Sequence, residues 1–241
     1  MNRFILFIAV LTVLAASVLA GGPVSSVDID RLAERVVADP LSIDARMELA
    51  NAYLSLYDFS GNLGHVVLAE SAAYHALEID NRHVPGLNLM SRALALEGRF
   101  ADVLYVQHWS IEVELKNAES WGILGDAFME LGKYRDADSS YNQMRMRDDG
   151  FHTKVRLAAR EFDIGIVDVG LEGLSLAIDA AVNSEAVREI SERDLAAAYE
   201  LLARMNLATG DVEKSIAAAD ASLRARPGFL DALVVKAAAL R

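Results

Sequence analysis

The chain has 241 residues and no cysteine, which excludes disulfides, thiol catalysis and zinc held by cysteine. Acidic residues outnumber basic ones, 35 against 23, and the formal net charge of −12 repels a polyanion, so we expect no nucleic-acid partner. Only four prolines and 7% aromatic residues accompany a hydrophobic content of 53%, much of it helix-forming alanine and leucine. The composition therefore predicts an all-α protein.

Residues 1–20 form an apolar segment that follows a single positive charge at Arg3. The apolar run covers residues 4–20, and small side chains precede Gly21. This pattern is typical of a secretory signal peptide, and an uncleaved membrane anchor is the alternative. In either case we expect residues 21–241 to be exported, either to the periplasm or anchored to the outer face of the inner membrane.

Residues 120–141 have helical spacing of their apolar and small side chains, in the sequence SWGILGDAFMELGKYRDADSSY. Four of them fall at i, i+3, i+4 and i+7 on one helical face, namely Trp121, Leu124, Gly125 and Phe128. Gly132 predicts the end of this helix, and Ala137 and Tyr141 then share one face of a second helix. The stretch therefore predicts a helix, a tight turn and another helix, with Gly125 and Ala137 as packing residues where the two helices meet.

The same arrangement recurs along the chain. Gly98, in the sequence LEGRF, lies 34 residues before Gly132, in the sequence ELGKY, and Gly210 begins a similar turn later on. Each unit has an apolar face that it cannot bury alone, so neighbouring units must stack. We expect five units, at residues 43–81, 84–117, 118–149, 152–178 and 196–227, with single helices at residues 28–39 and 229–241.

These anchors make the chain similar to the tetratricopeptide repeat (TPR) family, whose pattern is W-x2-L-G-x2-Y followed by A-x3-F in a unit of about 34 residues. Residues 118–149 match that pattern most closely. The resemblance implies a right-handed α-solenoid of stacked helical hairpins over residues 21–241. It also implies a concave groove, lined by the first helix of each unit, that holds a peptide or a partner helix.

Two departures from the repeat length are visible. Seven extra residues lie between Tyr53 and Ala69, and about eleven lie between Ala177 and Tyr199. We expect these insertions to form either loops or extended helix ends. Insertions in a solenoid gather on one face, so they are also candidates for partner contact.

The family resemblance places one polar stripe in the groove. Its members are Asn51, Asn88, Arg92, Asp126, Arg156, Arg160 and Arg204. Arginine binds carboxylates in bidentate fashion, so these arginines predict an acidic partner segment or a C-terminal carboxylate. The alternative is that they pair with neighbouring carboxylates of the chain itself.

No catalytic, metal-binding or cofactor-binding motif is present, and the five histidines lack the spacing of metal ligands. The sequence therefore predicts an exported, non-catalytic scaffold for a protein or peptide partner, in bacterial envelope assembly or cytochrome maturation. The alternative is a structural protein that forms homo-oligomers through the apolar helix at residues 229–241.

Overall fold

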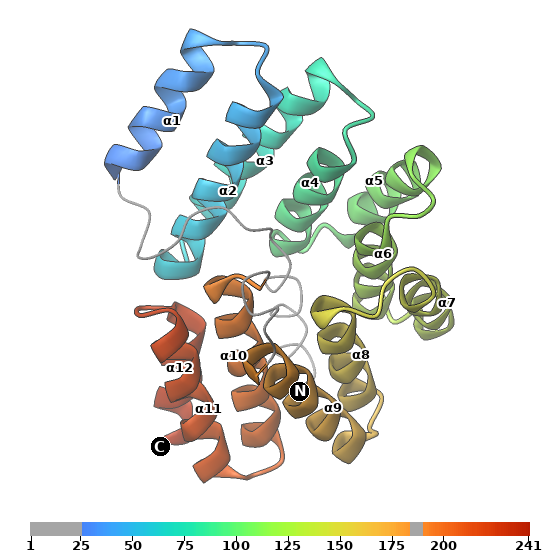
Figure 1. Ribbon diagram of the computed structural model, residues 1–241, viewed down its shortest axis with the longest axis vertical. Coiled ribbons are helices and arrows are strands. Elements are labelled where there is room, and N and C mark those ends of the chain that lie inside the picture. Colours follow the sequence, from blue (N-terminus) through green and yellow to red (C-terminus); the bar gives the residue numbers. More distant parts are fainter. Residues whose placement is uncertain (1–25, 184–189) are drawn as a thin grey trace. The chain divides into compact units, whose positions relative to one another are not determined.

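The computed structural model describes residues 26–183 and 190–241, and these residues form twelve α-helices and no β-strand (Figure 1). The predicted all-α class, an array of TPR-like helical hairpins, is confirmed. The described residues up to Arg147 form one compact unit, and those from Asp148 onward form a second. The proposed signal or anchor segment, residues 1–20, lies outside the described residues.

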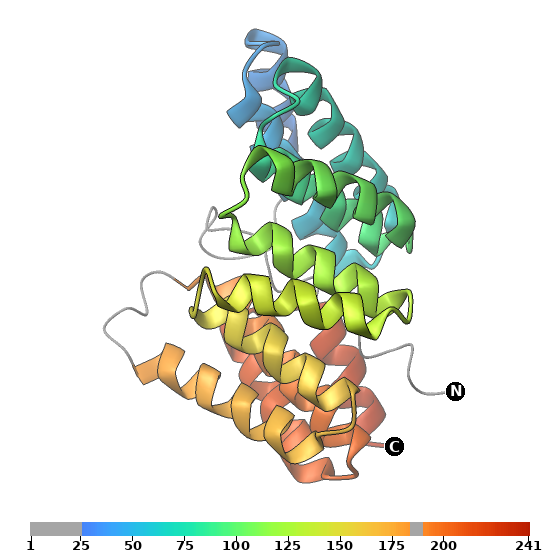
Figure 2. The same cartoon turned by 90° about the vertical axis from the view of Figure 1, so that its right-hand side faces the viewer.

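The N-terminal unit consists of one leading helix and three helical hairpins. Its helices are α1 (Ser26–Ala38), α2 (Ile43–Ser60), α3 (Leu63–Ile79), α4 (Val84–Leu96), α5 (Phe100–Val113), α6 (Ala118–Glu130) and α7 (Tyr134–Arg145). Consecutive helices pack together, and α4 also contacts both α2 and α6, the first helices of the neighbouring hairpins. Figure 2 shows the hairpins α4–α5 and α6–α7 as successive layers.

The C-terminal unit repeats this plan with two hairpins and a following helix. Its helices are α8 (Phe151–Asp163), α9 (Val167–Asn183), α10 (Glu192–Ala208), α11 (Val212–Ala225) and α12 (Leu230–Ala239). The first helix of the second hairpin, α10, contacts α8, α9, α11 and α12. The five predicted repeat units therefore correspond to five observed hairpins, and the two predicted single helices correspond to α1 and α12.

A glycine with a left-handed backbone ends the first helix of every hairpin. These are Gly61 (φ 64°), Gly98 (φ 76°), Gly132 (φ 70°), Gly165 (φ 93°) and Gly210 (φ 84°). Glycine adopts this conformation without the steric penalty of a Cβ atom. At the α6–α7 turn the amide of Lys133 then donates to the carbonyl of Phe128 at 2.8 Å, which satisfies a carbonyl at the helix end.

The first insertion forms extended helix ends. Helices α2 and α3 have 18 and 17 residues, whereas α6 and α7 of the regular hairpin have 13 and 12. The turn between them is short because Gly61 ends α2 and Asn62 caps α3. In the second insertion α9 continues to Asn183, and residues 184–189 are outside the described part of the chain.

Gly125 and Ala137 are packing residues, as predicted. A Cβ atom at Gly125 would lie 2.6 Å from Cε1 of Tyr141 on the facing helix α7, closer than real contacts allow. Ala137 is completely buried on the same helix. The small residue on α6 therefore makes room for the tyrosine ring on α7.

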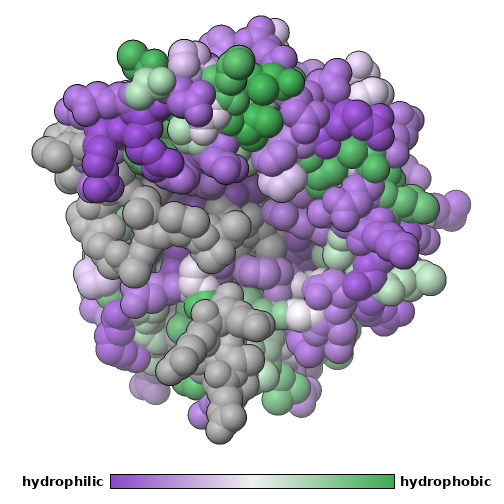
Figure 3. Space-filling model, turned by 45° about the horizontal axis from the view of Figure 1, so that its top comes forward, coloured by the Kyte–Doolittle hydropathy of each residue, from purple (hydrophilic) through white to green (hydrophobic). Residues whose placement is uncertain are grey.

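Figure 3 shows hydrophilic side chains over most of the face it draws, with separate apolar patches between them. Within the described residues, no helix combines the length and the apolarity needed to cross a bilayer.

Candidate partner-binding site

The predicted polar stripe divides between the two units. Asn51, Asn88, Arg92 and Asp126 belong to the N-terminal unit, and the other three residues belong to the C-terminal unit. Arg92 is buried, and Asn51 is half-buried with its amide donating to the carbonyl of Met47 in its own helix at 3.0 Å.

Asn88 takes part in a buried network that joins three helices. Its Oδ1 accepts from Ser120 Oγ at 3.0 Å and from Ser110 Oγ at 3.4 Å. Its Nδ2 donates to Asn117 Oδ1 at 3.4 Å, and Asn117 in turn caps α6 by accepting from the amide of Ser120 at 2.9 Å. The Asn88 side chain, only 3% exposed, thus holds α4 against α5 and α6.

Asp126 also has an internal partner. The hydroxyl of Tyr141 donates to Asp126 Oδ1 at 2.8 Å, and both side chains are buried. This hydrogen bond orients the ring that contacts Gly125. Asp126 therefore supports the packing of α6 on α7.

Two of the three stripe arginines in the C-terminal unit have acidic neighbours within their own helices. Arg204 Nε lies 2.8 Å from Glu200 Oε1, one turn away on α10, and Arg160 pairs with Glu161 on α8. Burial raises the pKa of Glu200 to about 7, although Arg204 opposes the shift. Arg156, only 2% exposed, is buried on the same helix as Arg160. Intramolecular pairing, the alternative weighed for these arginines, is thus observed at Arg160 and Arg204, and their role in partner binding stays a prediction.

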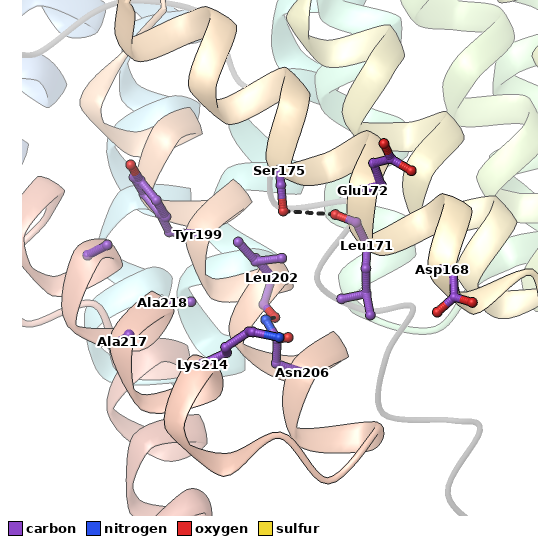
Figure 4. A pocket seen from close by; sticks show the side chains of 11 residues that line it. Asp168, Leu171, Glu172, Ser175, Tyr199, Leu202, Asn206, Lys214, Ala217 and Ala218 are labelled. Atoms are coloured by element: carbon purple, nitrogen blue, oxygen red, sulfur yellow. Dashed lines mark hydrogen bonds between the residues drawn. The ribbon is translucent and has the colours of Figure 1, made fainter.

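A groove lies on a different face of α10, between α9 and α11 (Figure 4). Its volume is about 550 Å³. Its floor and walls are mostly apolar, formed by Leu171, Tyr199, Leu202, Ala217, Ala218 and Ala221. We call this hollow the α9–α11 groove.

Charged residues stand at the edge of the α9–α11 groove. Asp168 and Glu172 are exposed and lie one turn apart on α9. Lys214 on α11 is the cation among the lining residues, and its Nζ is 2.8 Å from Asp211 Oδ2. The hydrogen bond to Lys214 lowers the pKa of Asp211 and raises that of Lys214, so the two neutralise each other.

The polar groups inside the α9–α11 groove donate to their own helices. Ser175 Oγ donates to the carbonyl of Leu171 at 2.9 Å, as Figure 4 shows, and Asn206 Nδ2 donates to the carbonyl of Leu202 at 2.8 Å. The oxygen atoms of these two side chains can therefore still accept hydrogen bonds from a ligand.

The groove lies where a shorter side chain occupies a position that is aromatic in another hairpin. Asn206 lies seven residues after Tyr199, as Phe128 lies seven residues after Trp121. The ring of Phe128 packs edge to face with His108 of the preceding helix α5, with centroids 6.5 Å apart. The shorter Asn206 lines the groove at the equivalent position of α10, together with the alanines of α11. This site was not predicted from the sequence, although the asparagine at an aromatic position was a visible signal.

The described residues contain no group of three or more metal-ligating side chains close enough to hold an ion. Two half-buried histidines have structural contacts instead. His83 caps α4 by accepting from the amide of Gly86 at 3.1 Å, and His152 Nε2 lies 3.9 Å from Asp194 Oδ2.

The TPR fold is defined by three features, which are helical hairpins with a glycine turn, contact between the first helices of hairpins, and a small residue that faces a large one. The chain has this fold. No family model and no curated protein matches its sequence.

The comparison with solved structures supports the same fold. The chain resembles TTC0263, a TPR protein of Thermus thermophilus, with a TM-score of 0.64 and 16% identity over 83% of this chain and 99% of that one. It also resembles a chain of the APC/C hetero-tetramer Cut9–Hcn1, with a TM-score of 0.66 and 13% identity over 88% of this chain and 40% of that one. A human IFIT1 dimer, solved with m7Gppp-AAAA, gives a TM-score of 0.62 and 13% identity over 89% of this chain and 50% of the other.

Proposed function

We propose that the chain is an exported, non-catalytic scaffold that holds a segment of a partner protein, in envelope assembly or cytochrome maturation. The observation that carries this proposal is the α9–α11 groove, because an open hollow with an apolar floor and a few polar groups suits a peptide or helix. Stacked hairpins also offer the extended surfaces that repeat proteins use for binding. The apolar run of residues 4–20 supports export.

The test is capture of a partner by the immobilised full chain. Ala217 is exposed in the groove, so Ala217→Trp fills the hollow while leaving the core unchanged. The matched control is Leu176→Trp, because Leu176 is exposed on α9 outside the groove. We expect the wild type and the control to retain the same protein from an envelope extract, and Ala217→Trp to retain at most a tenth as much. Equal retention by all three would contradict the proposal.

The polar stripe is a second candidate surface for the same function. We propose it for an acidic segment, on the strength of its arginines. Arg160→Ala is the suitable variant, because Arg204→Ala would leave the buried Glu200 without this ion pair. Binding of a captured partner that is unchanged in Arg160→Ala would count against the stripe.

Self-assembly is the alternative function, and exposed apolar residues on α12 and directly after it favour it. Leu233, Val234 and Leu240 are 45%, 58% and 66% exposed. In a homo-oligomer, a second copy would cover them. Light scattering after size exclusion should then give at least twice the monomer mass for the wild type, and the monomer mass for Val234→Glu. A monomeric wild type at high concentration would exclude this alternative.

A further inference from the structure

We propose that the α9–α11 groove recognises a basic partner segment, in which apolar residues are flanked by arginine or lysine. This inference rests on the proposed scaffold function and adds the chemical class of the partner. It differs from the acidic partner that the polar stripe predicts.

Two carboxylates stand at the edge of the groove. Asp168 and Glu172 lie at i and i+4 on α9, where like charges face each other and repel. Neither carboxylate forms an ion pair with a cation in the part of the chain that the structure describes. A cation from a partner would reduce this repulsion and would be attracted to both carboxylates.

The floor of the groove offers oxygen atoms that can accept hydrogen bonds. Asn206 is only 5% exposed, and its Nδ2 is already used by the carbonyl of Leu202. Its Oδ1 has no hydrogen-bond partner among the described residues, and it lines the groove together with the acceptor side of Ser175 Oγ. A groove that offers hydrogen-bond acceptors suits a side chain with several hydrogen-bond donors. The side chains of arginine and lysine carry donors and no acceptor.

The other residues that line the groove also suit a basic partner segment. The ring of Tyr199 borders the groove and offers a π face to a cation. Leu171 and Leu202 offer apolar contact for the aliphatic stems or for neighbouring apolar residues. Lys214 is neutralised by Asp211 and does not cancel the two carboxylates on α9.

Two synthetic peptides test the inference. One is a fluorescein-labelled helical peptide of leucine and alanine with two arginines one turn apart, and the other carries glutamates in their place. Their binding to the full chain is measured by fluorescence anisotropy. We expect the arginine peptide to bind the wild type at least tenfold more tightly than the glutamate peptide, and to weaken as salt is raised, because exposed charges are screened.

Variants locate the effect. Asp168→Asn combined with Glu172→Gln should weaken binding of the arginine peptide about tenfold. The matched control removes two carboxylates from the same unit outside the groove, through Asp179→Asn with Glu213→Gln, and should bind as the wild type does. Ala217→Trp should abolish binding of the arginine peptide.

If the double variant and its control lose affinity for the arginine peptide equally, the inference is overturned, because the loss would then come from the change in net charge. Equal affinity of the wild type for the two peptides, or no binding of the arginine peptide, would also overturn it. If partner capture is still lost in Ala217→Trp, the scaffold function survives these failures and only the basic class is wrong.

Discussion

At the scale of single residues, the pair of Gly125 and Tyr141 sets how closely α6 approaches α7. In the α10–α11 hairpin the corresponding residues are Ala203 and Ala219, both completely buried. A small residue thus faces a large one in the α6–α7 hairpin, and two alanines face each other in the α10–α11 hairpin. The two hairpins therefore bury different pairs of side chains at the same place in the repeat.

The first prediction concerns this pair. Gly125→Ala places a Cβ atom 2.6 Å from the ring of Tyr141, so we expect it to lower the free energy of unfolding by about 1–3 kcal/mol through overpacking. In the background of Tyr141→Ala the same substitution should be nearly neutral. A double-mutant cycle by urea unfolding measures the coupling. Additive effects of the two changes would show that the ring does not limit the approach.

The second prediction compares two glycines of α9. A Cβ atom at Gly170 would lie 2.8 Å from the carbonyl oxygen of Ala158, and backbone cannot move aside, whereas at Gly173 it would make an ordinary 3.5 Å contact. We therefore expect Gly170→Ala to destabilise by about 1–3 kcal/mol. Gly173→Ala should be neutral or stabilising, because alanine favours the helix. Equal melting temperatures for the two variants would contradict the close approach of α8 and α9.

The third prediction is a pH dependence caused by Glu200. Burial raises its pKa from 4.5 in the unfolded chain to about 7, so the folded state binds this proton more tightly. Its contribution to stability is complete below pH 4.5 and is lost as the pH rises towards 7. Glu200→Gln cannot titrate and should flatten the decline in unfolding free energy over this interval. An unchanged slope in urea titrations across the interval would refute the assignment.

At the scale of helices, periodicity predicted the hairpins well because most units contain a polar face and a glycine turn. It failed to single out the packed face of α12, because Leu233 and Leu240 are as apolar as the residues beside them. The structure buries Ala232, Val235 and Ala239 instead. The sequence LDALVVKAAA is apolar almost all round, so spacing alone could not select the packed face, and contact with α10 and α11 decides it.

The fourth prediction concerns the hairpin turns. A Cβ atom at Gly132 would meet nothing within 4 Å, so only its φ of 70° disfavours another residue. We expect Gly132→Ala to destabilise by about 1 kcal/mol and Gly132→Asn by less, because asparagine visits the left-handed region more readily. Thermal unfolding of both variants measures the difference. A larger loss in the asparagine variant would show that the conformation is not the cause.

At the scale of the whole molecule, the repeat architecture was predictable and the binding surface was not. The family resemblance directed attention to the stripe of Arg92, Arg160 and Arg204, because position in the repeat defines that stripe. The α9–α11 groove instead lies where Asn206 occupies the position that Phe128 holds in another hairpin. Residue patterns record which side chains are present, whereas a hollow depends on the volume that several helices leave unfilled together.

Photo-cross-linking can show whether the α9–α11 groove holds a partner. Benzoylphenylalanine replaces Ala217 inside the groove in one full-length variant, and Leu176 outside it in another. After irradiation of the cells, we predict a discrete cross-linked protein from residue 217 and none from residue 176. Cross-linking of the same protein from both positions, or from residue 176 alone, would contradict the account.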